Sequence, residues 1–205
     1  MSQREKMHSG ELYISMDEEI LKEQFVCLEK LYDYNQTRPS EGARRAALLR
    51  EMMAECGENC YIEPPLRANW GGHYVHLGKG VYANFNLTLV DDTHIYIGDY
   101  TMLGPNVVLA TAGHPLLPEL RDETYQYNLP IHIGKSCWLG AGVIVLPGVS
   151  IGDGSVIGAG SVVTRDIPPN VLAMGTPCRV VRELDERDRE TYFHGRKIDP
   201  ALLKK

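Results

Sequence analysis

The sequence has no apolar run of about 18 residues, so it predicts no transmembrane helix. Its first residues, Met-Ser-Gln-Arg-Glu-Lys, lead into no apolar segment, which predicts that there is no secretory signal. The 21 Lys and Arg residues are fewer than the 27 Asp and Glu residues, and a net charge of −6 argues against a general nucleic-acid-binding face. We therefore expect a cytoplasmic protein with neither a membrane nor a nucleic acid as partner.

Several chemical motifs are also missing. The chain contains no C-x-x-C pair, and its odd number of cysteines, five, predicts free thiols in a reducing compartment rather than a disulfide framework. It contains no G-x-S-x-G elbow for a nucleophilic serine and no G-x-x-x-x-G-K-[ST] loop for phosphates. These absences argue against a covalent serine mechanism and against a classical nucleotide-binding loop.

What the chain does have is a local surplus of glycine. It contains 20 glycines in 205 residues, and 15 of them lie between Gly71 and Gly160, whereas the first 70 residues hold only three. They do not recur at every third position, so a collagen helix is excluded. A glycine load confined to one stretch predicts a segment that turns often and repeats.

The repeat has a period of six. Six aliphatic residues follow one another at this interval, namely Ile133, Leu139, Val145, Ile151, Ile157 and Val163. Five of the six precede a glycine or a threonine, and the same register appears upstream at 97–110 and more loosely from Leu77. An α-helix cannot keep a strict six-residue period on one face, and the hairpin dipeptides of a β-meander are missing.

A parallel β-helix of hexapeptides satisfies this pattern. Each unit would give one short strand with its aliphatic residue inward, and the glycine after it would allow a corner with positive φ. Three units close a triangular coil of 18 residues, so we expect coils at 77–94, 97–114, 133–150 and 151–168. The fold class predicted is mainly β, with a helical N-terminal segment and a short C-terminal helix.

Helical spacing marks the first part of the chain. Ser15 and Glu18 have the spacing of a capping box, and apolar residues then recur until the chain approaches Pro39. Ser40 is expected to cap a second helix that closes at Gly57. We therefore predict a helical hairpin over 1–58, a β-helix over 59–182, and a tail over 183–205 with a polar helix at about 183–193.

The repeat is interrupted once. It stops after His114 and resumes at Ile133, so the proline-rich stretch 115–132 should leave the coil as a loop. His114 stands where the regular coil meets this loop, and imidazole is suited to proton transfer near neutral pH. The sequence alone leaves open whether His114 is functional. His94 and His132 alternate with buried-type isoleucines and are expected to face outward without a role.

Metal binding is the competing interpretation of the histidines. Some hexapeptide-helix proteins bind zinc through three histidines, and His73, His76 and His114 could be proposed. Two histidines three residues apart on a flat strand point to opposite faces, however, and no second histidine lies near His114 in the sequence. We therefore expect no metal. Cys137 occupies an inward position and is interpreted as part of the core.

The chain resembles the galactoside acetyltransferases, in the maltose/galactoside branch of the hexapeptide-repeat acetyltransferases. The resemblance extends over nearly the whole chain. It rests on Gly10-Glu11-Leu12-Tyr13, Glu63-Pro64-Pro65, Tyr82-Ala83-Asn84-Phe85-Asn86-Leu87-Thr88, Val90-Asp91-Asp92, Gly113-His114-Pro115 and the segment 175–182, Gly-Thr-Pro-Cys-Arg-Val-Val-Arg. It implies a left-handed β-helix, a homotrimer with active sites between subunits, and direct transfer of an acetyl group from acetyl-CoA to a sugar hydroxyl.

The resemblance also implies roles for particular residues. His114 would be the general base and Asn84 the donor to the oxyanion. The positions that would contact the acceptor are Ser15, Asp17, Asn69, Tyr82, Asn84 and Asp92. The positions that would contact acetyl-CoA, a cosubstrate, are Trp138, Ala141, Ala159, Thr164, Arg165, Arg179 and Arg182, with the two last suited to phosphate.

The chain departs from the galactoside pattern at two places. It has Ser15 where those enzymes have an aspartate, with Asp17 two residues later, a variant closer to the maltose enzymes. The stretch 67–74 is one residue longer than the common form, which bears on Asn69. The alternatives to a sugar O-acetyltransferase are acetylation of an antibiotic or other xenobiotic, a zinc enzyme of the γ-carbonic-anhydrase type, and a non-catalytic scaffold.

Overall fold

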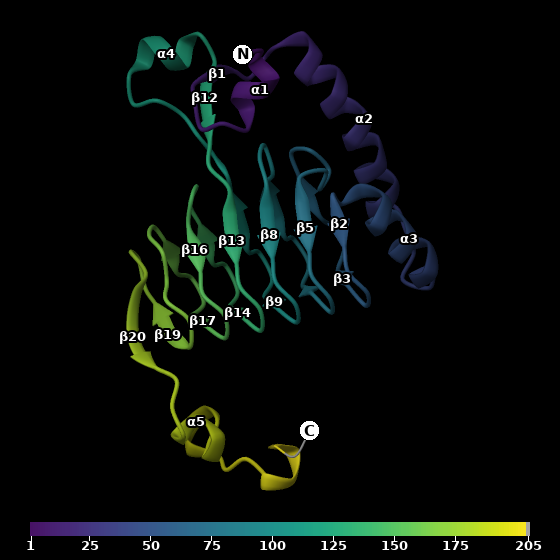
Figure 1. Ribbon diagram of the computed structural model, residues 1–205. Coiled ribbons are helices and arrows are strands. Elements are labelled where there is room, and N and C mark those ends of the chain that lie inside the picture. The colour runs from purple at the N-terminus through teal and green to yellow at the C-terminus, as the bar shows by residue number, and fades with distance from the viewer. Residues whose placement is uncertain (204–205) are drawn as a thin grey trace.

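The computed structural model describes residues 1–203 and shows a solenoid of stacked coils (Figure 1). A helical N-terminal segment lies at one end of the solenoid, and a short C-terminal segment extends from the other end. The last two residues of the predicted tail 183–205 lie outside the described residues.

The helices are α1 (Gln3–Met7), α2 (Glu18–Asn35), α3 (Gly42–Met52), α4 (Pro118–Asp122) and α5 (Arg187–Glu190), with 3-10 turns η1 (Phe193–Gly195) and η2 (Pro200–Leu203). The strands before the interruption are β1 (Tyr13–Ile14), β2 (Glu55–Cys56), β3 (Tyr61–Ile62), β4 (Arg67–Ala68), β5 (Val75–Leu77), β6 (Tyr82–Ala83), β7 (Thr88–Val90), β8 (Ile95–Ile97), β9 (Met102–Leu103), β10 (Val108–Ala110) and β11 (Ala112–Gly113). Those after it are β12 (Tyr125–Asn128), β13 (Ile131–Ile133), β14 (Trp138–Leu139), β15 (Ile144–Val145), β16 (Ser150–Ile151), β17 (Val156–Ile157), β18 (Val162–Val163), β19 (Val171–Met174) and β20 (Arg179–Glu183).

Three sheets form the sides of the solenoid. We call them sheet I (β4, β7, β10, β15, β18), sheet II (β2, β5, β8, β13, β16) and sheet III (β3, β6, β9, β14, β17, β19, β20). Strands within each sheet are parallel from coil to coil, except that β20 folds back antiparallel on β19. The chain passes from sheet III to sheet I to sheet II in every coil.

The six-residue period fills the core as the sequence predicts. All six aliphatic residues from Ile133 to Val163 are at most 3% exposed, and Cys137 is 1% exposed. The inward residue of each strand stacks on its equivalent one coil away, as Leu103, Leu139 and Ile157 do in sheet III. The hydrophobic effect therefore acts along the whole length of the solenoid on one column of side chains per sheet.

The glycines after these aliphatic residues have a different role from the one predicted. Gly98, Gly134, Gly140, Gly152 and Gly158 have no positive φ; the left-handed positions are instead those of Gly142, Gly148, Gly154 and Gly160, along with Asn86, Asn106 and others. A Cβ on Gly140 would lie 2.7 Å from the amide nitrogen of Ala159 in the next coil, so glycine is required there by close backbone approach. The prediction of a positive-φ corner at these positions was wrong.

One coil was missed. Strands β2, β3 and β4 form an additional coil before Leu77, paired with β5, β6 and β7. Its inward residues Cys56, Ile62 and Ala68 do keep the six-residue spacing and pair with Leu77, Ala83 and Leu89, but only Ile62 is a large aliphatic residue, so the pattern does not stand out in the sequence.

The N-terminal helices differ from the prediction at their caps. The N-cap of α2 is Asp17, whose Oδ1 accepts from the backbone N–H groups of Glu19 and Ile20, and Ser15 instead donates its hydroxyl to the carbonyl of Thr124. The N-cap of α3 is Glu41 rather than Ser40, and α3 ends at Met52, five residues before Gly57. Among residues 1–203, no helix has both the length and the apolar character needed to cross a bilayer.

Two other boundaries change. The interruption is not an irregular loop: it contains α4 and β12, and β12 pairs antiparallel with β11 and with β1. It ends at Pro130, because Ile131 and His132 already belong to β13. The predicted helix at 183–193 is limited to α5, since Glu183 is still part of β20.

Histidine and tyrosine rings form a row on the outer face of sheet II, and His8 of the N-terminal segment packs beside this row. His76, Tyr96 and His132 stack from coil to coil, and His76 Nε2 lies 2.9 Å from His94 Nδ1. His8, which caps α1, packs its ring 4.6 Å from that of Tyr74. His132 faces outward as predicted, but His94 is half-buried and hydrogen-bonded in this row.

The close approach at Gly140 can be tested by adding one methyl group. Gly140→Ala should lower the free energy of unfolding by about 1–3 kcal/mol, since the coil below cannot yield its backbone. The control is Gly42→Ala at the start of α3, where no atom from outside the helix backbone lies within 4 Å of the new methyl group and stability should not fall. Urea unfolding compares the two variants, and equal midpoints would contradict the close-approach interpretation.

The docking of α1 should depend on pH through His8. Burial of its ring, aided by His94 and Arg4, lowers the pKa of His8 from 6.5 to about 4. Between these values the unfolded chain binds a proton that the folded chain does not, so stability should fall as pH falls from 6.5 towards 4. His8→Phe keeps a ring that cannot be protonated, and its unfolding free energy should fall less over this window. Parallel pH curves for the two proteins would rule out this role.

Candidate functional site

The environment of His114 fixes which nitrogen carries its proton. His114 follows β11, and its Nδ1 lies 2.9 Å from the backbone carbonyl oxygen of Tyr125 on β12. A carbonyl only accepts, so Nδ1 carries the hydrogen and Nε2 keeps a free lone pair. The side chain is exposed, and Nε2 can therefore take a proton from a bound molecule.

Glycine before His114 makes this geometry possible. A Cβ on Gly113 would lie 2.6 Å from the Tyr127 ring and its hydroxyl oxygen, so only glycine lets Tyr127 lie against the chain here. Gly113 pairs with Tyr127 across the β11–β12 ladder. The interrupting segment 115–130, which we call the excursion, thus returns to the coil beside His114 and fixes the orientation of the His114 ring through the Tyr125 carbonyl.

Three of the predicted site residues form hydrogen bonds with consecutive residues at the start of strand β12. The carbonyl of Thr124, just before the strand, accepts from the Ser15 hydroxyl, and the carbonyl of Tyr125 accepts from His114. The side-chain amide of Gln126 donates to Oδ1 of Asp92 over 3.2 Å. Ser15, His114 and Asp92, which are far apart in the sequence, therefore surround one short strand.

Asp92 is a largely buried carboxylate with amide donors on both oxygens. Its Oδ2 accepts from the Asn69 side chain over 2.9 Å, and the carboxyl group is 8% exposed. Burial raises the pKa of Asp92, while the hydrogen bonds from Asn69 and Gln126 act in the opposite direction. Asn69 itself is exposed, so Asn69 and Asp92 present a polar pair at this edge.

The neighbouring Asp91 shapes the turn after Asn69. Its two carboxylate oxygens accept from the backbone N–H groups of Trp70 and Gly72, each over 2.8 Å. Complete burial raises the pKa of Asp91 to about 7 against the effect of these bonds. This is a structural role, and it fixes the longer 67–74 stretch in place.

Sequence reasoning missed the polar network behind Asp92. Gln126 also donates to the hydroxyl of Tyr13 and to Oδ1 of Asn128, and Asn128 donates to the carbonyls of Met7 and Asp92. Tyr13, Gln126 and Asn128 are at most 7% exposed. The alternation of polar residues in Tyr125–Asn128 was the available signal, but nothing in it showed which buried groups would meet them.

Asn84 lies at a different edge, with its amide group oriented. Its Oδ1 accepts from the backbone N–H of Phe85 over 2.8 Å, which leaves the amide N–H groups to donate outward. A groove of about 330 Å³ runs beside it, lined by Tyr82, Met102, Trp138 and Ala141 among others. The arrangement can donate a hydrogen bond to an oxygen that develops negative charge in this groove.

Small residues continue from Asn84 along the same edge. Ala141 and Ala159 occupy equivalent turns in successive coils, where Gly160 donates its N–H to the Ala141 carbonyl. Both alanines are exposed, and the adjacent Gly140 and Gly158 add no side chain. The edge therefore offers a shallow track on which an extended ligand can lie.

The two arginines at the end of sheet III differ in their contacts. Arg179 is exposed and donates to the Cys178 carbonyl, and Arg182 forms a two-pronged ion pair with Asp188 at 2.6 and 2.7 Å. This ion pair and the backbone N–H of Asp185 lower the pKa of Asp188 to about 2. Arg182 is therefore held in a fixed orientation beside α5.

The predicted site residues divide between two edges of the prism. Asn84, Ala141 and Ala159 lie on the turns from sheet III to sheet I, which we call the III–I edge; Tyr82 and Trp138 lie beside it on sheet III. Asn69, Asp92, His114, Thr164 and Arg165 lie on the turns from sheet I to sheet II, the I–II edge. About six residues of extended chain, or ~20 Å, separate the edges within one chain.

Zinc coordination finds no support in side-chain grouping. Within residues 1–203, no three or more His, Cys, Asp or Glu side chains are placed to hold a metal ion together. His73, His76 and His114 are not brought together: the first two belong to the region of the ring row on sheet II, and His114 lies beside β12.

Comparison with protein families gives two matches within the chain. Residues 6–57 match the maltose acetyltransferase hexapeptide capping motif, and residues 130–165 match six repeats of the bacterial transferase hexapeptide. The first match covers helices α2 and α3, and the second covers the strands β13 to β18 that follow the excursion.

Known proteins resemble the chain over nearly its whole length. The galactoside O-acetyltransferase of Lactococcus lactis subsp. lactis (strain IL1403) is 54% identical over 194 residues, or 95% of this chain and 94% of the relative. A solved galactoside acetyltransferase in complex with coenzyme A has 45% identity and a TM-score of 0.94, covering 97% of this chain and 99% of its own. A maltose O-acetyltransferase of Clostridium difficile 630 has 41% identity and a TM-score of 0.88, covering 91% and 99%. The solenoid is thus the left-handed β-helix of these acetyltransferases.

Proposed function

Since the chain belongs to the maltose/galactoside family of hexapeptide-repeat acetyltransferases and is an acetyl-CoA-dependent acetyltransferase, we propose that it acetylates a hydroxyl group of a galactoside or similar sugar. The observation that carries the proposal is the hydrogen bond from His114 Nδ1 to Tyr125, which leaves Nε2 free as a base. A sugar hydroxyl is a very weak acid and needs such a base as it attacks a thioester.

The transfer is direct. The sugar oxygen attacks the thioester carbonyl carbon of acetyl-CoA while His114 Nε2 takes the hydroxyl proton. The resulting oxyanion accepts a hydrogen bond from the Asn84 amide, whose orientation is set by Phe85. The carbon–sulfur bond then breaks, and the imidazolium returns the proton to the departing thiolate, so that the products are the sugar ester and free coenzyme A.

The acceptor is recognised at the I–II edge. The polar pair of Asn69 and Asp92 offers amide and carboxylate groups that suit sugar hydroxyls. Ser15 and Asp17 reach the same place because Ser15 is bonded to Thr124 beside β12, although Asp17 Oδ1 is already used as a helix cap. Tyr82 and Asn84 complete the acceptor site from the III–I edge.

The cosubstrate lies along the prism edges. Ala141 and Ala159 leave room for the pantetheine arm, with Trp138 at its side, and Thr164 and Arg165 flank it from the I–II edge. Arg179 and Arg182 stand at the end of the solenoid, where guanidinium groups suit phosphates. The thioester is thereby directed towards Asn84.

The proposed base and the proposed oxyanion donor must meet at one thioester, and this requirement supports a homotrimer. His114 and Asn84 lie on edges ~20 Å apart in one chain, so the base of one subunit must meet the asparagine of another. A contact between the III–I edge of one copy and the I–II edge of the next is heterologous, and such contacts close into rings. Three copies would then turn their sheets I towards a common axis.

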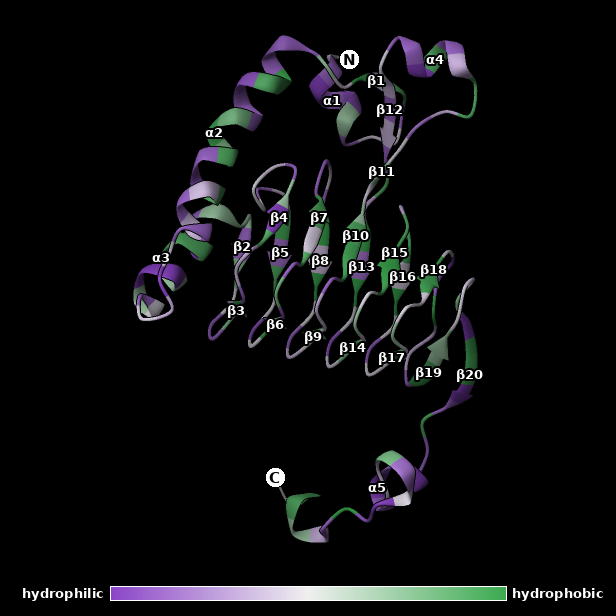
Figure 2. Ribbon diagram, turned by 180° about the vertical axis from the view of Figure 1, so that it is seen from behind, coloured by the Kyte–Doolittle hydropathy of each residue, from purple (hydrophilic) through white to green (hydrophobic). Residues whose placement is uncertain are grey.

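The outer face of sheet I suits that burial. Most of its outward residues are apolar and half-buried even in the single chain, namely Val90, Val108, Ala110, Ile144, Leu146 and Val162; the polar exceptions are Thr88 and the exposed Arg67 at the N-terminal end. Figure 2 shows β10, β15 and β18 in the colour of hydrophobic residues. An apolar face fits a subunit interface when it lies between two edges that carry His114 and Asn84 respectively.

We also propose a division of labour along the chain. The segment 1–58 braces the acceptor end through β1, the β-helix 59–182 with its excursion carries the chemistry, and the described part of the tail, 183–203, borders the cosubstrate. The place of action that we propose is the cytoplasm.

Turnover tests the proposal directly. Wild-type protein should transfer acetyl groups from acetyl-CoA to members of a panel of galactosides, glucosides and maltose, with His114→Ala lowering kcat by about 10²–10⁴-fold. An antibiotic acceptor in the same panel tests the xenobiotic alternative. Circular dichroism and coenzyme A binding should be unchanged in the variant. Full turnover by His114→Ala would disprove the assigned base.

A shared site can be tested by mixing two inactive variants. His114→Ala and Asn84→Ala subunits, refolded together, should recover about a quarter of wild-type activity, because random assembly pairs an intact His114 with an intact Asn84 at that frequency. The control mixes each variant with the double variant, which contains no intact pair. No recovery in the first mixture would place both residues of a site in one chain.

A further inference from the structure

A second, larger cavity lies between sheet III and the C-terminal segment. Its volume is about 700 Å³, and Trp138 and Val156 of sheet III form one wall. Arg182, at the end of sheet III, also lines the cavity, and the opposite wall consists of Arg187, Tyr192 and Phe193 of the C-terminal segment. Arg187, Tyr192 and Phe193 belong to neither the acceptor site nor the pantetheine contacts that we propose.

The cavity continues the groove beside Asn84. Trp138 lines both spaces, so its ring stands at their junction. The outward positions of sheet III follow in register from Tyr82 through Met102, Trp138, Val156 and Leu172 to Arg182. These are five inter-strand steps of ~4.8 Å, or ~24 Å from Tyr82, two residues before Asn84, to the end of the sheet.

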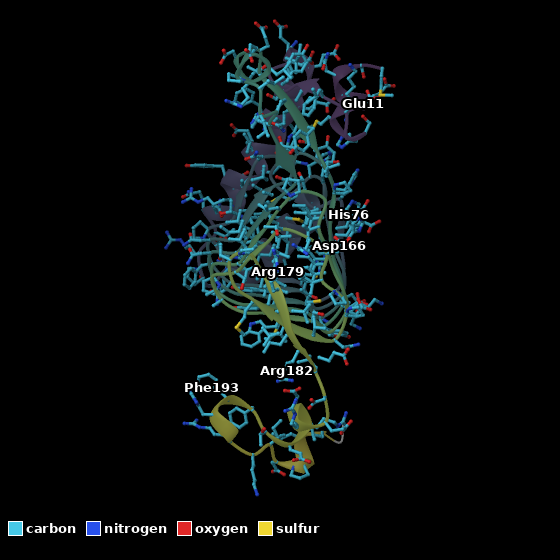
Figure 3. All side chains as sticks on the ribbon, turned by 90° about the vertical axis from the view of Figure 1, so that its left-hand side faces the viewer. Glu11, His76, Asp166, Arg179, Arg182 and Phe193 are labelled. Atoms are coloured by element: carbon cyan, nitrogen blue, oxygen red, sulfur yellow. The ribbon has the colours of Figure 1, made fainter. Side chains whose placement is uncertain are left out.

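The lining combines open aromatic faces with guanidinium groups. Trp138 is 54% exposed, Tyr192 55% and Phe193 73%, so their rings are available to a planar partner. Arg182 is paired with Asp188, and Arg187 is paired with Asp185. Figure 3 shows Arg182 extending from the end of β20 towards the segment that carries Phe193.

Aromatic rings and guanidinium groups together suit a purine nucleotide, since bases stack on the rings and phosphates pair with arginine. We propose that residues 184–193 form a strap over the nucleotide end of acetyl-CoA, with Tyr192 and Phe193 packing on the purine and Arg187 pairing with a phosphate. The inference rests on the proposed function for the identity of the cosubstrate, and it adds three binding residues to it.

An acetyl donor that lacks the nucleotide distinguishes loss of stacking on the purine from a general effect on the enzyme. In the double variant Tyr192→Ala/Phe193→Ala, KM for acetyl-CoA should rise about tenfold with kcat unchanged, because stacking on the base is lost. KM for acetyl-pantetheine, which carries the same thioester, should not change. A KM for acetyl-CoA equal to that of the wild type, or an equal rise for both donors, would overturn the proposal.

Matched variants and a binding assay keep the test independent of catalysis. Phe25→Ala removes an aromatic ring of α2 that is 65% exposed and far from the cavity lining, and Arg44→Gln removes an exposed arginine paired with Glu41; neither should alter either KM. Calorimetry with adenosine 3′,5′-bisphosphate should show binding to the wild type, weaker binding to the double variant, and weaker binding to Arg187→Gln. If no sugar is acetylated but these affinities fall, the proposed function fails and the strap stands; equal affinities in all variants would overturn the strap.

Discussion

The spacing between successive coils governs this structure. Backbone hydrogen bonds hold each coil about one strand separation from the next. At several corners the gap is too small for a Cβ, as at Gly98, where one would lie 2.6 Å from the Gly134 carbonyl carbon. Inside the prism, the same spacing stacks aliphatic residues in unbroken columns. The rigid frame results from these two demands together, because neither the core columns nor the corner glycines can be changed in one coil without disturbing the next.

The frame places chemistry on its edges rather than in a cleft of its own. A prism side filled with core residues has no room for a substrate, so polar groups appear where the chain turns, and here they fall on two edges separated by sheet I. The excursion 115–130 compensates in part for this, because β12 brings Ser15, His114 and Asp92 to one place through ordinary strand and side-chain hydrogen bonds. In the function that we propose, assembly of the trimer completes the site, because it brings the III–I edge of one subunit against the I–II edge of its neighbour.

Main-chain partners orient the two groups that we propose as the base and the oxyanion donor. Tyr125 offers a carbonyl to His114, and Phe85 offers an N–H to Asn84, so each side chain has one end fixed and one end free. Partners of this kind keep a reactive group oriented before the substrate arrives, and orientation that needs no rearrangement is what electrostatic catalysis requires. The aromatic and cationic cavity at the other end of sheet III would extend this proposed site towards the nucleotide, at a distance set by the coil spacing.

Much of the fold could be predicted from the sequence because its information is local. The period of six identifies the inward residues from Ile133 to Val163, and the break after His114 marks the excursion, since both are properties of neighbouring residues. The same reasoning failed where long-range contacts decide. Ser15 bonds to Thr124 instead of capping α2, and the coil β2–β4 forms by pairing with the coil after it although two of its three inward residues, Cys56 and Ala68, are small. The sequence by itself thus determined a β-helix of hexapeptides and the residue types of its site. Only the tertiary structure decided which nitrogen of His114 is free, which residues share an edge and what stands behind Asp92, because these depend on groups that the coils and the excursion bring together from distant parts of the chain.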